Sequence, residues 1–209
     1  MVSSVTALRL LLASFALAFL AACSGREAAE TTSTTTSTVA PVAVALTLTS
    51  VEPNGTAPPS NEVIAGVEGT LNRYIAGAVI QPLQTGAVPP ELPELFTPAA
   101  AARLGAEDRA SLVDEGLPRF PRIDPLVATF GVSTIADGDG LVGVVVARLD
   151  LQVRASRKKT AVDIVRQGDF VLVPDPAGWK IDSYQIHAAR DTVPPTTTTA
   201  PPKGEERDE

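Results

Sequence analysis

The sequence is poor in the residues from which most metal and catalytic sites are built. Its 209 residues include one cysteine and one histidine, and aromatic residues make up only 4%. A single histidine, His187, excludes a metal site with two histidine ligands, and a single cysteine, Cys23, excludes an intramolecular disulfide. The fold must therefore be held together by its hydrophobic core, and the sequence predicts no metal and no cofactor.

Positive charge is also scarce. The chain carries 17 Lys and Arg against 24 Asp and Glu, which gives a formal net charge of −7. Nucleic-acid-binding proteins usually present a basic surface, so this balance argues against nucleic acid as a partner. A local basic cluster lies at the end of a predicted hairpin, where a solvated turn is expected; it consists of Arg154, Arg157, Lys158 and Lys159.

A long apolar run is present at the N-terminus, but it is too short to cross a membrane as a helix. It extends from Leu10 to Ala22, whereas a transmembrane helix needs about 20 residues. The hydrophobic region of a secretory signal peptide has the observed length. We therefore predict a signal peptide over residues 1–22.

The end of this run resembles the lipobox of bacterial lipoproteins. Leu20, Ala21 and Ala22 directly precede Cys23. The resemblance implies cleavage before Cys23, a diacylglyceryl thioether on its sulfur, and a further acyl chain such as palmitate on the new amino group. Two or more acyl chains anchor a protein stably. We expect a lipid-anchored protein on the extracytoplasmic face of the cell membrane; an ordinary secretory signal is the alternative.

Two segments of biased composition flank the centre of the chain. Residues 23–59 are rich in Thr, Ser, Ala, Val and Pro, and residues 192–209 combine proline pairs with a charged end. Such compositions bury too little apolar surface to offset the entropy of ordering, so we predict a disordered linker and a disordered tail. Val42–Leu48 could form a short strand, but its apolar residues do not alternate cleanly. One folded domain is expected over residues 60–191.

The first half of this domain has the periodicity of helices. Ser60 or Asn61 is a good N-cap, and Pro82 is expected to end the first helix. Thr97 followed by Pro98 starts a second, short helix over 99–104, and a third is predicted over 106–115. The buried stripe of the first helix consists of Ile64, Val67, Leu71, Tyr74, Ile75 and Ala78.

The second half has the pattern of β-strands. We predict strands over 126–135, 141–155, 160–173 and 179–190, joined by short turns, with a bulge at Gly168–Asp169. In the second strand the apolar residues occupy one face. The residues that alternate with them from Arg148 to Arg154 form a polar opposite face. Helices followed by an antiparallel meander indicate an α+β fold with the helices packed on one face of a curved sheet.

One stretch of this meander resembles a known family. Gly168–Asp175 followed by Gly178–Tyr184, with Trp179, Lys180 and Ile181, is similar to the last hairpin of NTF2-like (SnoaL-like, cystatin-type) domains. The resemblance implies a cone in which the sheet curls around the long first helix and leaves a pocket at its open end. Some relatives catalyse reactions in this pocket and others only bind ligands or dimerise, so a homodimer is also compatible with the resemblance.

The pocket implied by this resemblance defines the candidate site. Alternation places His187 on the face of Trp179 and Ile181, with Tyr184 on the opposite face. His187 and Asp163 are the candidate general bases, although a surface position is the more common role for each. The candidate pocket residues are Tyr74, Phe130, Asp163, Trp179, Tyr184 and His187.

These residues form no recognisable catalytic set, so the sequence favours a protein without enzymatic activity. The favoured function is a membrane-anchored module that binds a small apolar ligand or a protein of the cell envelope. The alternative is a small isomerase- or cyclase-like enzyme, with Asp163 or His187 as base and Tyr74 as hydrogen-bond donor. An envelope spacer without any ligand is a third reading, which a closed and filled cone would favour.

Overall fold

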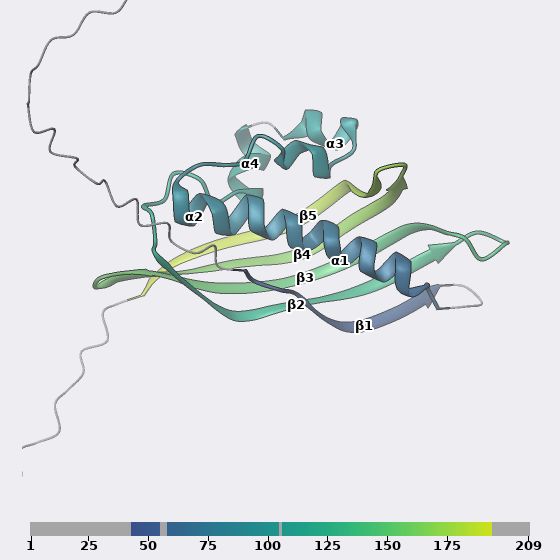
Figure 1. The fold of residues 1–209 in the computed structure, drawn as a ribbon, viewed down its shortest axis with the longest axis horizontal. Helices are drawn as coiled ribbons and strands as arrows, with labels where there is room; N and C mark the ends of the chain where they lie inside the picture. Colours follow the sequence, from purple (N-terminus) through teal and green to yellow (C-terminus); the bar gives the residue numbers. More distant parts are fainter. Residues whose placement is uncertain (1–42, 55–57, 105, 194–209) are drawn as a thin grey trace, which may run out of the picture. The chain divides into compact units, whose positions relative to one another are not determined.

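The computed structural model describes residues 43–54, 58–104 and 106–193. The predicted signal peptide, Cys23 and most of the predicted tail lie outside these residues. The fold is α+β, with a five-stranded sheet in the order β1-β2-β3-β4-β5 and helices along one face (Figure 1). The strands are β1 (Thr47–Asn54), β2 (Arg122–Ala136), β3 (Val142–Arg157), β4 (Thr160–Asp175) and β5 (Gly178–Val193).

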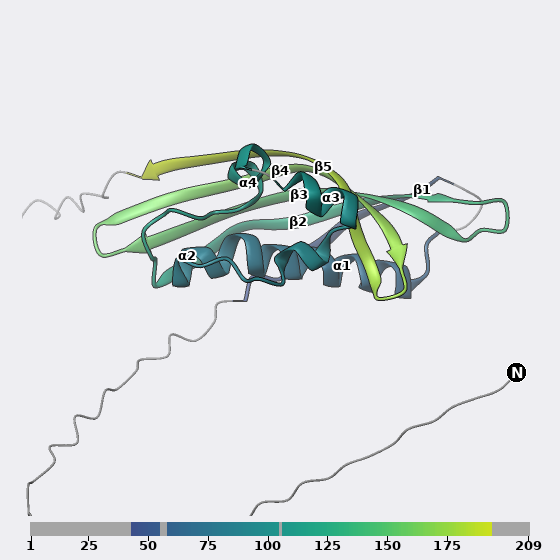
Figure 2. The same cartoon turned by 90° about the horizontal axis from the view of Figure 1, so that it is seen from above.

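The helices precede the four long strands in the chain. Seen from a second direction, the long first helical segment follows the strands of the sheet (Figure 2). The helical elements are α1 (Asn61–Ile75), a π-helical segment (Ala76–Ile80), α2 (Gln81–Thr85), a 3₁₀ turn (Leu92–Leu95), α3 (Pro98–Arg103) and α4 (Ala106–Leu112).

The start of α1 and its buried stripe confirm the prediction. The Ser60 side chain accepts a hydrogen bond from the Val63 N–H, which satisfies one of the free donors at the helix N-terminus. Five of the six stripe residues are fully buried, and Ile64 is partly buried against the same core. Thr97 caps α3 in the same way, by accepting from the Ala100 N–H.

Pro82 does not end the first helix, contrary to the prediction. Proline lacks the N–H that would donate to the carbonyl of Ala78 in a regular α-helix. Here the chain passes through a π-helical segment before Pro82, and the Ala78 carbonyl accepts instead from the Asp114 N–H, at 2.8 Å. The helical run continues to Thr85 and ends at Gly86, whose φ of 76° is the left-handed conformation that favours glycine.

β1 lies within the segment predicted as linker, so the prediction of disorder is wrong for residues 47–54. Val44 and Leu46 are buried and Leu48 is half-buried, whereas Ala43 and Ala45 between them are exposed. This alternation precedes β1. Within β1 every residue except Leu48 is exposed, so the strand itself carries no apolar stripe in its sequence. β1 pairs with β2 in parallel, which makes the sheet mixed rather than antiparallel throughout.

The remaining four strands form the predicted antiparallel meander. On the helix-covered face of β3, Val145, Ala147, Leu149, Leu151 and Val153 are all buried, as the alternation predicts. The opposite face of the sheet, which we call the open face, carries Arg148, Asp150 and Arg154. The turn between β2 and β3 lies at Asp137–Gly140, where the Asp137 side chain accepts from the backbone N–H groups of Asp139 and Leu141.

The predicted bulge at Gly168–Asp169 is wrong in its position. Pairing is continuous through Gly168 on both sides, and the register shifts instead in β5, where Asp182 is the additional residue. Gly168 is required for a different reason. Its φ is 145°, and a Cβ there would lie 1.9 Å from the carbonyl oxygen of Gln185 in β5.

The bulge at Asp182 reverses which residues of β5 face the helices. Side chains alternate between the two faces of a strand, so one additional residue moves every later side chain to the opposite face. Trp179 and Ile181 before the bulge, and Tyr184 after it, therefore all contact the helical layer. His187 lies on the open face and is exposed. The prediction that His187 shares the face of Trp179, with Tyr184 opposite, is corrected on both points.

Candidate functional site

The structure divides the six candidate pocket residues between the two faces of the sheet. Phe130 is buried on the helix-covered face, opposite Leu149 of β3. Trp179 packs against Gly66 of α1, and its carbonyl accepts a hydrogen bond from the Thr70 hydroxyl. Tyr74 and Tyr184 lie in the same layer, whereas Asp163 and His187 lie on the open face.

Tyr74 is fully buried at the centre of the interior between the helices and the sheet. Its hydroxyl donates to the carbonyl of Leu112 at 2.8 Å. Its ring meets Phe170 at a centroid distance of 4.9 Å and Phe96 at 6.4 Å, both edge to face. Burial raises the pKa of Tyr74 well above its ordinary value. The phenol is therefore held neutral and already bonded, as a core residue rather than a free donor.

Tyr184 joins the last strand to the helical layer. Its hydroxyl lies 3.0 Å from Oδ2 of Asp108 in α4, and its ring packs edge to face on Phe96 at 6.0 Å. Burial and the hydrogen bond to Asp108 raise the pKa of Tyr184 to about 12. This contact ties β5 to α4 at neutral pH.

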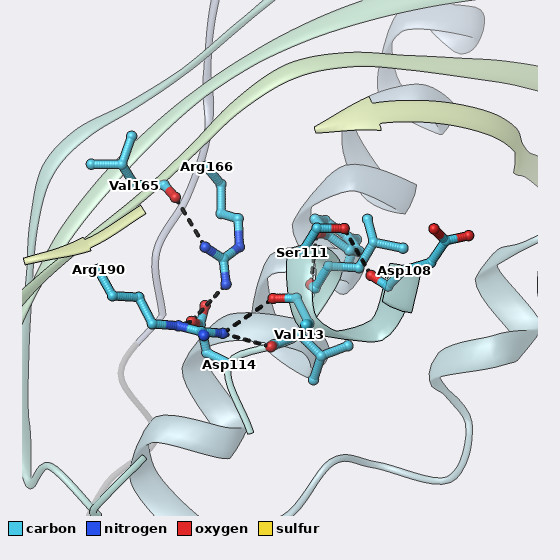
Figure 3. Close-up of polar contacts among 10 residues, drawn as sticks. Asp108, Ser111, Val113, Asp114, Val165, Arg166 and Arg190 are labelled. Carbon is cyan, nitrogen blue, oxygen red and sulfur yellow. Dashed lines mark hydrogen bonds and ion pairs between the residues drawn. The ribbon is translucent and has the colours of Figure 1, made fainter. Parts of the chain in front are cut away.

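A charged cluster that the sequence analysis missed lies in the same interior (Figure 3). Arg166 of β4 and Arg190 of β5 both point toward Asp114, which follows α4. Oδ1 of Asp114 lies 2.6 Å from Nη2 of Arg166 and 2.7 Å from Nε of Arg190. The side chains of Arg166 and Asp114 are 0% exposed, and that of Arg190 is 32% exposed.

Arg190 links the cluster to the end of α4. Its Nη2 donates to the carbonyl of Val113 at 3.0 Å and more weakly to that of Ala110 at 3.4 Å. Nη1 of Arg166 donates to the carbonyl of Val165 at 3.0 Å. Nε and Nη2 of Arg166 and Oδ2 of Asp114 make no directed hydrogen bond within the described part of the chain. The contact between Arg166 and Asp114 is thus ionic rather than a well-aligned hydrogen bond.

The cluster suits an electrostatic role rather than proton transfer. A guanidinium group remains protonated in proteins, so neither arginine can act as a base. Two guanidinium groups contact the same carboxylate oxygen of Asp114 and balance its negative charge. The cluster fastens the segment after α4 to the sheet from within. Part of its signal was present in the sequence, because Arg166 interrupts the apolar face formed by Ile164 and Phe170, but nothing local marked Asp114.

The two candidate bases lie away from Tyr74. Asp163 forms a two-bonded pair with Arg154 of β3, with both N–O distances at 2.7 Å. The hydrogen bond from Arg154 holds the pKa of Asp163 below its ordinary value, which makes it a poor base at neutral pH. His187 is exposed on the same open face. The structure does not bring Asp163 or His187 together with Tyr74.

The open face carries a hollow of about 220 Å³ over β1, β2 and β3. Gly131 forms its floor, and a Cβ there would lie 2.5 Å from the hydroxyl of Ser50. Its rim includes the pair between Arg148 and Asp169, at 3.1 Å. The other polar lining residues are Thr49, Glu52, Thr129, Ser133 and Asp150. This surface offers hydroxyl, carboxylate and guanidinium groups to a partner.

A second hollow, of about 250 Å³, lies on the outer side of the helical layer. It is bounded by Arg73, Gly77 and Gln81 of the first helical run and by Pro89 and Leu92 of the following segment. Neither hollow reaches the interior around Tyr74.

Within the described residues, no group of three or more His, Cys, Asp or Glu side chains is placed to hold a metal ion. No helix among residues 43–54, 58–104 and 106–193 is both long enough and apolar enough to span a membrane. No family model, no curated protein and no solved structure matches the chain.

Proposed function

We propose that this chain is a lipid-anchored, non-catalytic module that binds a protein of the cell envelope on the extracytoplasmic side of the membrane. The anchor is Cys23, supported by the lipobox resemblance of Leu20–Cys23. The domain is proposed to be NTF2-like, which is supported by a long helical run and short helices along one face of a four-stranded antiparallel meander.

The contrast between the filled interior and the open face carries this proposal. Tyr74, Phe170 and Arg166 are all fully buried where the family resemblance would place a pocket. The open face instead presents a polar hollow and ion pairs whose side chains are available to a partner, with Arg148 81% exposed. An envelope protein with complementary polar and charged groups fits this surface better than a small apolar ligand does.

The alternative of an isomerase- or cyclase-like enzyme has less support. It needs Asp163 or His187 to share a pocket with Tyr74, and these residues lie on opposite faces of the sheet. The spacer hypothesis is consistent with the filled interior, but it gives no role to the polar hollow at Gly131. A second copy of the chain is a further candidate partner for the open face, and the experiment below separates it from an envelope protein.

Site-specific photo-crosslinking in the original host tests the proposal. A photoreactive amino acid is placed at Ser133 on the open face, and in a matched variant at Glu68 of α1, which is half-buried as Ser133 is. We expect Ser133 to give one discrete adduct to another protein and Glu68 to give none. An adduct of twice the chain mass would replace the envelope partner with a homodimer. Equal labelling at both positions, or none at either, would contradict a binding role for the open face.

A further inference from the structure

The charged residues of the domain are segregated along the strands. β3 spans 16 residues, and at about 3.3 Å per residue the two ends of the sheet are about 50 Å apart. One end contains the start of β2, the β3–β4 hairpin and the end of β5. The other contains the β2–β3 and β4–β5 hairpins together with the end of β1. At an ionic strength of 0.1 M the screening length is about 10 Å, so the two ends act independently on a charged surface.

The first of these ends, which we call the basic end, carries exposed cations. Arg157 pairs with Thr160 across a two-residue turn, and Arg122 at the start of β2 lies opposite Ser156. Two of the carboxylates at this end are already bonded to arginines, Asp124 to Arg122 and Asp163 to Arg154. The exposed cations of the basic end are Arg119, Arg122, Arg157, Lys158 and Lys159.

The opposite end, the acidic end, carries mainly exposed carboxylates. Asp137 and Asp139 form the β2–β3 turn, and Asp175 begins the β4–β5 turn. Glu52 of β1 and Glu62 of α1 lie at the same end. The domain is thus electrically polar along its length, although the chain as a whole has a formal net charge of −7.

The described chain enters and leaves the fold on the side of the basic end. β1 runs parallel to β2 and starts at Thr47 opposite Thr129, so the residues before it head toward the start of β2. β5 finishes at Val193 opposite Ala161, beside the β3–β4 hairpin (Figure 1). The segment between Cys23 and Ala43 can span at most about 70 Å. The chain that leads back to Cys23 therefore joins the described fold on the side of the basic end.

The β3–β4 turn has two central residues, Lys158 and Lys159. Lys158 has a φ of 53°, a left-handed conformation that favours glycine or asparagine. Lysine at this position is exposed and has no hydrogen bond or ion pair within the described residues. The first central residue of a two-residue hairpin turn has a positive φ in both favoured turn types, so the turn places Lys158 at the tip of the hairpin.

From these observations we infer that the basic end docks on the anionic headgroups of the membrane that carries the lipid anchor. The inference rests on the proposed anchoring of the chain and adds the orientation of the domain. Arg157, Lys158 and Lys159 contact lipid phosphates, while the acidic end is repelled and points away. Each cation near an anionic surface strengthens membrane binding about fivefold, so these three together contribute about 100-fold.

Vesicle co-sedimentation tests the docking without the lipid. The chain from residue 23 onward, with Cys23→Ser, is mixed at low salt with one of two kinds of vesicle. One consists of phosphatidylcholine alone, and the other contains about 30 mole per cent of the anionic lipid phosphatidylglycerol. The test variant combines Arg157→Gln, Lys158→Asn and Lys159→Gln. The matched control combines Arg73→Gln, Arg103→Gln and Lys180→Gln, which removes the same charge outside the basic end.

We expect binding to the anionic vesicles only, a loss of about 100-fold in the test variant, and a change of less than about threefold in the control. Added salt should abolish the binding. Lys158→Asn suits the left-handed turn, so the test variant should remain folded. Equal losses in the two variants, binding to phosphatidylcholine alone, or no binding at low salt would overturn the docking. The protein is not lipidated in this assay. An absence of vesicle binding would therefore not contradict the anchor at Cys23, and an absence of lipidation in the host would not contradict vesicle binding.

Discussion

The two faces of the sheet each carry an arginine–aspartate pair, in opposite environments. Arg166 and Asp114 are both 0% exposed beneath the helices, whereas Arg154 and Asp163 are 42% and 27% exposed on the open face. A buried ion loses its hydration, and removing its partner leaves an uncompensated charge. Water replaces the partner of an exposed ion at little cost. The interior pair therefore stabilises the fold, whereas the exposed pair is accessible to a partner.

The largest expected effect comes from removing the buried carboxylate. Asp114→Ala should lower the free energy of unfolding by about 3–5 kcal/mol, because Arg166 is left charged and buried without a counterion. Urea unfolding followed by circular dichroism measures the change. The double variant Asp114→Leu with Arg166→Met should recover most of the loss. A change below about 1 kcal/mol for Asp114→Ala would show that the interior is not sealed from water.

The next effect concerns the close approach of two strands. Gly168→Ala places a Cβ 1.9 Å from the carbonyl oxygen of Gln185 and should cost at least about 1–3 kcal/mol in unfolding free energy. Gly143→Ala is the control, because a Cβ there meets no atom within 4 Å among the described residues. If the two substitutions have the same effect, the backbone at Gly168 must relax freely, and the continuous pairing of β4 with β5 would be in doubt.

A smaller effect is expected at Tyr184. Tyr184→Phe removes the hydrogen bond to Asp108 and should cost about 1 kcal/mol at pH 7. The pKa of Tyr184 is raised to about 12 in the folded state, from a reference value of 10.0. The folded state therefore retains a proton that the unfolded state releases, so its stabilisation is full below pH 10 and is lost between pH 10 and 12. The phenylalanine variant should lose less stability over this range, as measured by thermal melting.

The smallest effect is expected at the exposed pair. Arg154→Gln should leave the unfolding midpoint at pH 7 nearly unchanged, because both partners are solvated. The pKa of Asp163 is lowered by its hydrogen bond to Arg154. Any contribution of the pair is therefore present above the ordinary aspartate pKa and disappears as the pH falls through the lowered value. A large midpoint shift at pH 7 would remove the distinction between the two faces.

Patterns that depend on neighbours in the sequence predicted much of the fold. The stripe of α1, the Thr97 cap and the alternation in β3 follow from local periodicity, which the burial in the structure reproduces. The strand at residues 47–54 was missed because every residue in it except Leu48 is exposed, so its sequence carries no apolar alternation. The helix through Pro82 depends on a tertiary hydrogen bond from Asp114, which no local pattern contains.

The candidate site was less predictable, for a physical reason. A single additional residue at Asp182 reverses the faces of β5, and such a bulge is set by pairing with β4 rather than by composition. Tyr184 and His187 consequently each lie on the face opposite to the one predicted. Phe130 and Trp179, in contrast, were predicted to line a pocket between the helices and the sheet, and both lie in the helix-facing layer. The separation of basic and acidic residues between the two ends of the sheet could not be predicted, because only the strand register shows which residues lie at the same end.

The central claim is that the domain is displayed from a lipid on Cys23, and intact-mass analysis of the protein from the host membrane fraction tests it most directly. We expect the mature chain to begin at Cys23 and to carry the mass of a diacylglyceryl group, with or without a further acyl chain. The Cys23→Ser variant should lose that mass and leave the membrane fraction. A chain that retains residues 1–22, or one whose Cys23 carries a free thiol, would contradict the account.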